Sequence, residues 1–107
     1  MLVFKEPAQW ARGLMGFTQA QAKDGALFIL HQEAPWPISS DGLDFPIDVF
    51  WLSEGGMVLE HAEVFPGMGI VWPDVQSKLI LELPMQEQPA YRIGDFVEVP
   101  HDASANT

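Results

Sequence analysis

The sequence contains no cysteine, which excludes disulfide bonds and thiolate metal ligands and leaves the redox environment undetermined. Basic residues are also scarce: five lysines and arginines stand against fifteen aspartates and glutamates, giving a formal net charge of −10. A field of this sign repels nucleic acid phosphates and anionic lipid surfaces. We therefore expect neither nucleic acid nor a membrane as a partner. The acidic surface suits solvation, a cationic partner or a salty environment.

Long apolar runs are absent too, and none reaches the roughly 18 residues of a membrane-spanning helix. The N-terminus has no basic region followed by a long apolar core, so we expect a cytoplasmic protein, unless a secretory leader has been removed. No glycine-rich phosphate-binding motif is present. Ser39, Ser40 and Ser53 have no neighbouring base. The sequence therefore predicts no cofactor and gives little support to nucleophilic catalysis.

Residues 45–64 carry the clearest structural signal and predict a β-hairpin. Residues 47–52 are mostly β-branched or aromatic and are apolar on both alternating faces, which is typical of a central strand covered on both sides. Gly55 and Gly56 can take the positive φ angles of a tight turn, after which the chain returns as a second strand. Asp48 is a carboxylate in the most apolar part of this hairpin.

Other segments predict one short helix and further short strands. Glu6-Pro7 suits the start of a helix, because proline is favoured at the first helical position. Three apolar residues then fall at the spacing of its buried stripe: Trp10, Leu14 and Met15. Strands are expected at residues 2–5, 25–31, 78–83 and 96–99. In the third of these, alternation places Leu79, Leu81 and Leu83 on one face and Lys78, Ile80 and Glu82 on the other.

Six or so short strands separated by turn signals predict one all-β domain over residues 1–99, either a small β-barrel or a two-sheet sandwich, with a short N-terminal helix. Residues 100–107 are expected to form a polar tail. Residues 32–44 form a loop longer than most connections, which favours a binding role. Trp36 in this loop is either an anchor on the core or an exposed contact residue, and Trp72 is expected to lie near it.

Several blocks of the sequence, in their order and spacing, resemble the DUF192 family, a domain of unknown function. The blocks are Ala11-Arg-Gly-Leu-Met15, Gly25-Ala-Leu-Phe28, Pro46-Ile-Asp-Val-Phe50, Leu79–Leu83 and Ile93-Gly-Asp95. The resemblance spans about residues 2 to 99 and implies a compact, mainly β domain with no established activity. Members typically carry a Phe-Trp-Met-Lys-Asn-Thr block before the Pro-Leu-Asp strand, whereas this chain has residues 37–44 without a matching Asn-Thr. If those polar residues form a site in relatives, this protein has lost or rebuilt it.

Arg12 and Asp48 fall in family-matching blocks and make the most economical oppositely charged pair among them. Arg12 could offset the desolvation of Asp48 as a structural ion pair, or both could line a cleft and bind a small polar ligand. Together with Trp36 and Trp72, they are the candidate ligand-binding residues.

His61 and Glu63 share a strand face at period two and are the candidate metal ligands, although a solvated strand face is the simpler interpretation. His31 and His101 would have to converge on them from elsewhere in the chain. No cofactor is therefore predicted.

The leading hypothesis is a non-catalytic ligand-binding or accessory domain, whose partner is an unknown small molecule or protein. The alternatives are a small enzyme that depends on a metal or on carboxylates, and an acidic protein-interaction module. A binding domain requires a concave apolar pocket with few polar groups. An enzyme requires clustered titratable residues with strongly shifted pKa values, and an interaction module requires a flat exposed apolar patch rimmed by acids.

Overall fold

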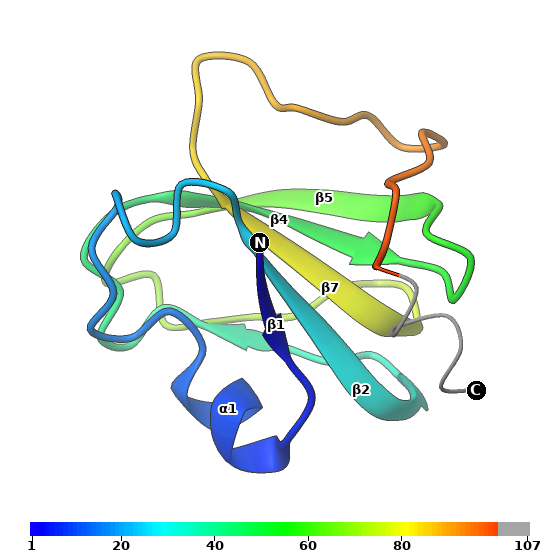
Figure 1. Ribbon diagram of the computed structural model, residues 1–107, viewed down its shortest axis with the longest axis horizontal. Helices are drawn as coiled ribbons and strands as arrows, with labels where there is room; N and C mark the ends of the chain where they lie inside the picture. Colours follow the sequence, from blue (N-terminus) through cyan, green and yellow to red (C-terminus); the bar gives the residue numbers. More distant parts are fainter. Residues whose placement is uncertain (101–107) are drawn as a thin grey trace.

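A computed structural model describes residues 1–100 of the 107-residue chain, and these residues form a mainly β domain of 33 × 29 × 25 Å (Figure 1). Two sheets are present, a five-stranded sheet in the order β1-β2-β7-β4-β5 and a two-stranded sheet of β3 and β6. The elements in chain order are β1 (Leu2–Phe4), α1 (Pro7–Arg12), β2 (Ala26–Ala34), β3 (Ile38–Ser39), β4 (Ile47–Leu52), β5 (Val58–Val64), β6 (Ile70–Val71) and β7 (Ser77–Pro84).

The predicted hairpin is confirmed as the β4–β5 antiparallel pair, and β4 lies between β5 and β7. All six residues of β4 are buried, as expected of a strand covered on both faces. Their side chains alternate between two cores. Ile47, Val49 and Trp51 belong to the first core, and Phe50 and Leu52 belong to the second.

The first core lies between the large sheet and a layer made of α1, the turns that follow it, and the β3–β6 sheet. The second core lies on the opposite face, where side chains of the C-terminal segment 85–100, including Tyr91, Val97 and Val99, pack on the sheet. The two-sheet sandwich is therefore the better of the two predicted architectures, because residues 1–100 contain no closed barrel. No helix in this part of the chain is long and apolar enough to span a membrane.

The short helix begins as predicted. Pro7 occupies its first turn, and Glu6 and Gln9 bond each other's backbone in a capping box. The helix ends at Arg12 because Gly13 adopts a positive φ of 53°. Of the predicted buried stripe, Leu14 is buried and Trp10 is half-buried, but Met15 lies beyond the end of the helix and is 41% exposed.

Three expectations about strands need correction. β2 continues to Ala34, so the predicted loop 32–44 is shorter, and it also contains β3. β6 lies in the segment after the hairpin, which was expected to be irregular. The expected strand at 96–99 makes only an isolated bridge between Phe96 and Met57, because Val97 contributes its side chain to the second core while the segment joins no sheet. The tail residues 101–107 lie outside the described residues.

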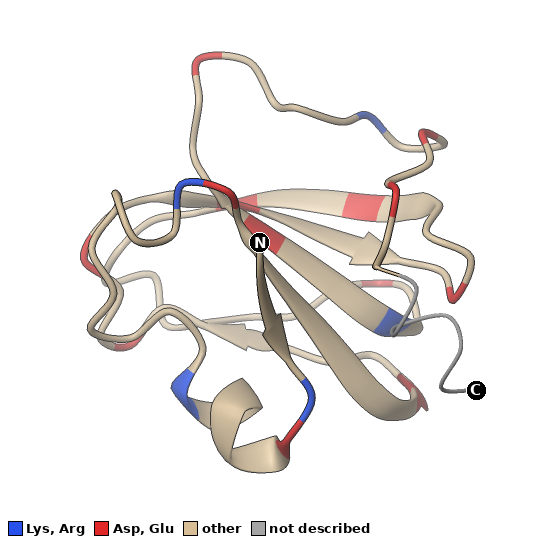
Figure 2. Ribbon diagram, viewed as in Figure 1, with Lys and Arg blue, Asp and Glu red and all other residues tan. Residues whose placement is uncertain are grey.

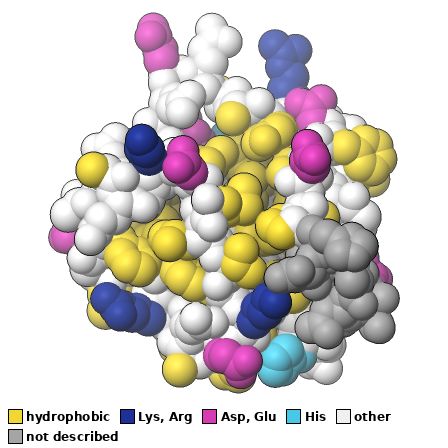
Figure 3. All heavy atoms as spheres, in the orientation of Figure 1, with side chains coloured by type: hydrophobic (Ala, Val, Ile, Leu, Met, Phe, Trp, Pro, Cys, Tyr) yellow, Lys and Arg dark blue, Asp and Glu magenta, His cyan; other side chains and the backbone are white. Residues whose placement is uncertain are grey.

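Acidic residues are spread over strand ends and loops around the domain and do not gather in one patch (Figure 2). Apolar side chains run across the centre of the face seen in Figure 3, with charged side chains around them. Two carboxylates depart from this surface distribution. Asp48 on β4 is 2% exposed, and Glu82 on the central strand β7 is 4% exposed. Glu82 is the one of these two that lines the pocket on the side of the first core.

Candidate ligand-binding pocket

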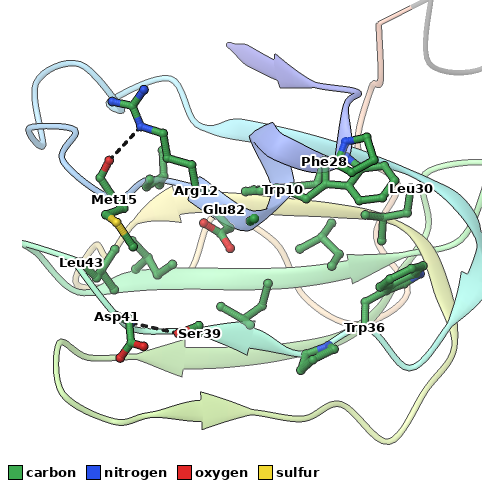
Figure 4. A pocket seen from close by; sticks show the side chains of 18 residues that line it. Trp10, Arg12, Met15, Phe28, Leu30, Trp36, Ser39, Asp41, Leu43 and Glu82 are labelled. Carbon is green, nitrogen blue, oxygen red and sulfur yellow. Dashed lines mark hydrogen bonds between the residues drawn. The ribbon is translucent and has the colours of Figure 1, made fainter.

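A pocket of about 280 Å³ opens on the side of the first core (Figure 4). Its wall is formed by α1 and the turn after it, its far side by the segment around β3, and its floor by the β2, β4 and β7 strands. Most lining side chains are apolar, and the polar ones are Arg12, Ser39, Asp41 and Glu82. This composition, with a few polar groups in an apolar cavity, is typical of small-molecule sites.

Two tryptophans form an aromatic corner of the pocket. Trp10 on α1 and Trp36 before β3 have ring centroids 6.0 Å apart. The indole N–H of Trp10 donates a hydrogen bond to the Phe4 carbonyl at 3.2 Å, and that of Trp36 donates to the Gln32 carbonyl at 2.9 Å. Because both indole N–H groups are bonded to backbone, the rings are held in position and present mainly carbon atoms to the cavity that they line.

Trp36 is also the anchor that the sequence suggested. Its backbone carbonyl accepts a hydrogen bond of 2.9 Å from the indole Nε1 of Trp51, which is fully buried in β4. The loop that carries Trp36 is therefore attached directly to the central strand. Of the two roles expected for Trp36, an anchor on the core or an exposed contact residue, the structure has the anchor, and the half-buried side chain also lines the pocket.

Glu82 supplies the only carboxyl group at the floor of the pocket, and Figure 4 shows it among the apolar side chains that line the cavity. Burial raises its pKa from 4.5 to about 8, because a charged carboxylate is poorly solvated there. Within residues 1–100, no group donates a hydrogen bond to this carboxyl or forms an ion pair with it. The floor of the pocket thus holds a carboxyl group without a protein partner, whereas the one fully enclosed side-chain polar atom without a partner among residues 1–100 is Ser77 Oγ.

Arg12 lies at the rim and is exposed. Its Nε donates a hydrogen bond to the Met15 carbonyl at 3.3 Å, and its guanidinium lies 5.2 Å from the ring centroid of Phe17. In Figure 4 the guanidinium points away from Glu82, toward the turn after α1. Arg12 therefore borders the cavity without neutralising the acid on its floor.

Residues 1–99 match the model of DUF192, a family described as Uncharacterized ACR. The chain belongs to the DUF192 family. No curated protein matches it.

Two crystal structures resemble this DUF192 domain. One is a protein of Sinorhizobium meliloti 1021 described as a candidate transcription regulator, with a TM-score of 0.68 and 22% identity over 77% of this chain. The other is a protein of unknown function from Novosphingobium aromaticivorans DSM 12444, with a TM-score of 0.68 and 18% identity over 77% of this chain. The DUF192 chain spans 65% and 60% of the lengths of these two proteins, and at such identities the similarity shows the fold alone.

The structure separates the four residues proposed from the sequence. Arg12 and Trp36 line the pocket of the DUF192 domain, whereas Asp48 and Trp72 do not. The expected Arg12–Asp48 ion pair is not formed. Asp48 shares the parity of Phe50 on β4 and faces the second core, whereas α1 covers the first, so the sheet lies between the two residues.

The partner of Asp48 is His61 on the neighbouring strand, whose Nε2 lies 2.8 Å from Asp48 Oδ1. The proposed metal pair of His61 and Glu63 therefore has its histidine already engaged. Glu63 is exposed, and residues 1–100 contain no group of three histidines, aspartates or glutamates that could hold a metal. His31 packs against Trp10, with ring centroids 4.7 Å apart. His101 lies outside the described residues.

Trp72 is 62% exposed and follows β6, which pairs with β3. The pairing of Ile38 with Val71 brings the two tryptophan-bearing loops together, but Trp36 makes its ring contact with Trp10. The pocket residues Trp10, Phe28 and Glu82 were not among the site residues predicted from the sequence. A signal for Glu82 was present, since it shares a strand face with Ile80, and an apolar neighbour at period two indicates a covered face.

Proposed function

We propose that this DUF192 domain binds a small, largely apolar molecule, without catalysing its conversion, in the pocket between α1 and the large sheet. The observation that carries this proposal is the pocket itself: a concave, mostly apolar cavity that has an ordered aromatic corner and few polar groups. Its volume of about 280 Å³ suits a ligand of one or two rings.

The arrangement of titratable groups favours binding over catalysis. Glu82 is the one buried acid in the lining, and the cavity offers it no histidine, lysine or second buried acid as a partner. General acid–base or nucleophilic catalysis requires such groups within hydrogen-bond reach of each other. A lone acid in an apolar cavity is better suited to orienting a ligand.

A second candidate function rests on a separate observation. Four apolar side chains between β5 and the residue after β6 are strongly exposed: Phe65, Met68, Ile70 and Trp72. Such a patch is typical of protein contact surfaces. It would give the domain a protein partner on the side of Trp72, independent of the pocket.

Thermal unfolding with a panel of small aromatic and aliphatic compounds tests the pocket. A compound that binds only the native state stabilises it by about 2.7 kcal/mol at a concentration of 100 Kd, which raises the melting temperature measurably. Ala11→Trp would fill the mouth, because Ala11 is an exposed residue of α1 that lines the pocket. Ala8→Trp is the matched control, since Ala8 lies on the same helix, is exposed and does not line the pocket.

We expect compounds that stabilise the wild type to stabilise Ala8→Trp equally and Ala11→Trp hardly at all. Equal stabilisation of both variants would place binding elsewhere and overturn the proposal. If no compound acts on the wild type, the exposed patch becomes the better candidate. A Trp72→Ala variant would then be compared with the wild type in protein-partner assays.

A further inference from the structure

The carboxyl group of Glu82 pairs with no residue of the described chain and is therefore available to bind a ligand. It lies on a central strand, its side chain lines the cavity, and no donor from residues 1–100 reaches it. Burying a polar group without a partner costs free energy, so a ligand that supplies a donor at this point would recover that cost. The floor of the pocket therefore selects for a ligand with a hydrogen-bond donor at one end.

The residues that line the pocket indicate which kind of hydrogen-bond donor the ligand carries. Trp10, Trp36 and Phe28 line the cavity, and aromatic rings attract organic cations. The protein carries a net charge of −10, which raises the local concentration of cations and lowers that of anions. Arg12 is the one basic residue in the lining, and it is directed toward Met15 and Phe17.

We propose that the ligand of this pocket is a small organic amine, which binds as its ammonium ion with the nitrogen at the Glu82 carboxylate and its apolar body against Trp10 and Trp36. This inference rests on the proposed function and specifies the chemical class of the molecule bound. An ammonium donates up to three hydrogen bonds and supplies the charge that a buried carboxylate lacks. A neutral alcohol supplies one donor and no charge, and a carboxylic acid supplies the wrong charge.

Binding of an amine has a proton signature. Burial raises the pKa of Glu82 to about 8, so at pH 7 the group is mostly protonated. An ammonium beside it stabilises the carboxylate, and the carboxyl proton leaves to solvent as the pair forms. With a pKa of about 8, full ionisation at pH 7 releases about 0.9 proton for each ligand bound. The other titratable groups of the lining are Arg12 on α1 and Asp41 after β3, both exposed at the rim.

Isothermal titration calorimetry with matched probes tests the inference. The probes are 2-phenylethylamine, 2-phenylethanol and 3-phenylpropionate, together with the corresponding indole series of tryptamine, tryptophol and indole-3-propionate. Each is titrated at pH 7 in buffers of different ionisation enthalpy, which reports the protons released. We expect one of the amines to bind at least about tenfold more tightly than its alcohol and to release close to one proton, and we expect the acids to bind more weakly still.

Glu82→Gln removes the ionisable group and keeps its shape. In this variant we expect the preference for the amine over the alcohol and the proton release to disappear, while the affinity for the alcohol stays within a few-fold. Glu87→Gln is the control for net charge, because Glu87 is exposed and does not line the pocket. It should behave as the wild type. The proton count on the wild type requires no variant, so a folding defect in Glu82→Gln would not prevent the test.

The outcomes separate the two proposals. If an alcohol binds as tightly as its amine, without proton release and with sensitivity to Ala11→Trp, the pocket binds ligands but the amine inference is overturned. Amine binding that survives Glu82→Gln unchanged also overturns it. If neither amine binds the wild type, the inference fails, and the response of the broader compound panel decides the proposed function separately.

Discussion

The imidazole Nε2 of His61 lies 2.8 Å from Oδ1 of Asp48, and this contact crosses the β4–β5 pair on the side of the second core. The His61 ring also stacks on Phe50, with centroids 4.8 Å apart. The Asp48 side chain is 3% exposed and that of His61 is 21% exposed. The most deeply buried carboxylate of the hairpin is thus satisfied within the hairpin, and α1 makes no contribution to it.

Replacing His61 with Ala should therefore lower the free energy of unfolding by about 1–3 kcal/mol, because it leaves the Asp48 carboxylate buried without its partner. Arg12→Ala should change stability by no more than about 0.5–1 kcal/mol, since Arg12 is exposed and loses only its contacts with Met15 and Phe17. Urea unfolding at pH 7 measures both. A larger loss for Arg12→Ala than for His61→Ala would contradict the assignment of His61 as the partner.

The hairpin was predictable from sequence because its information is local: β-branched and aromatic residues on both faces of 47–52, then a glycine turn. The partner of Asp48 was not predictable in the same way. The choice between Arg12 and His61 depends on which face of the sheet α1 covers, and that is set by the path of the whole chain. Alternation within each strand does not say whether the side chains of Asp48 and His61 share a face. That follows only from the register of the β4–β5 pair.

The same distinction between local information and information set by the whole chain applies to the remaining elements. β3 and β6 have two residues each and pair across some 30 residues of chain, so neither has enough length for a periodic signal. Residues 96–99 have the composition of a strand, yet Val97 packs in the second core and Val99 packs against it. Alternation in the sequence placed Glu82 on one strand face with Lys78 and Ile80 but did not indicate what covers that face. In the fold, α1 and the segment around β3 cover that face, so Glu82 lies on the floor of the pocket and not on the surface.

Gly56 provides a test of how the C-terminal segment attaches to the hairpin. Its φ is 94°, and an added Cβ would lie 2.6 Å from the backbone carbonyl of Val97. Gly67 has a similar φ of 85° but open space around it. Both alanine variants therefore carry backbone strain, and Gly56→Ala adds a backbone clash. We expect Gly56→Ala to be at least about 1 kcal/mol less stable than Gly67→Ala by urea unfolding; equal losses would show that residue 97 moves away freely.

The tryptophans allow the pocket to be observed directly. Trp36 lines it, whereas Trp72 is 62% exposed outside it. A ligand such as 2-phenylethylamine should change the intrinsic fluorescence of the wild type, and Trp72→Phe should preserve that change. Trp36→Phe should reduce it and weaken binding, because the aromatic corner with Trp10 is altered. A response lost in Trp72→Phe and kept in Trp36→Phe would move the site to the exposed patch.

Glu82 should also make the free energy of unfolding depend on pH in the absence of ligand. Its pKa is raised from 4.5 to about 8 by burial, so between these values the unfolded chain is ionised while the native protein keeps the proton. The native state then binds more protons than the unfolded state. By linkage, the contribution of Glu82 is fully present below pH 4.5 and is lost as pH rises through about 8, at a rate of about 1 kcal/mol per pH unit.

Glu82→Gln isolates this contribution from the fourteen other acidic residues, because it removes one titration and leaves the rest in place. The stability of Glu82→Gln relative to the wild type should therefore increase steadily from pH 5 to pH 8 and level off above that. Urea midpoints measured at half-unit intervals follow the difference, and Glu87→Gln should run parallel to the wild type since Glu87 is exposed. A difference that stays flat across this range would mean that Glu82 ionises normally in the native protein, and the pocket floor would then already be charged before any ligand arrives.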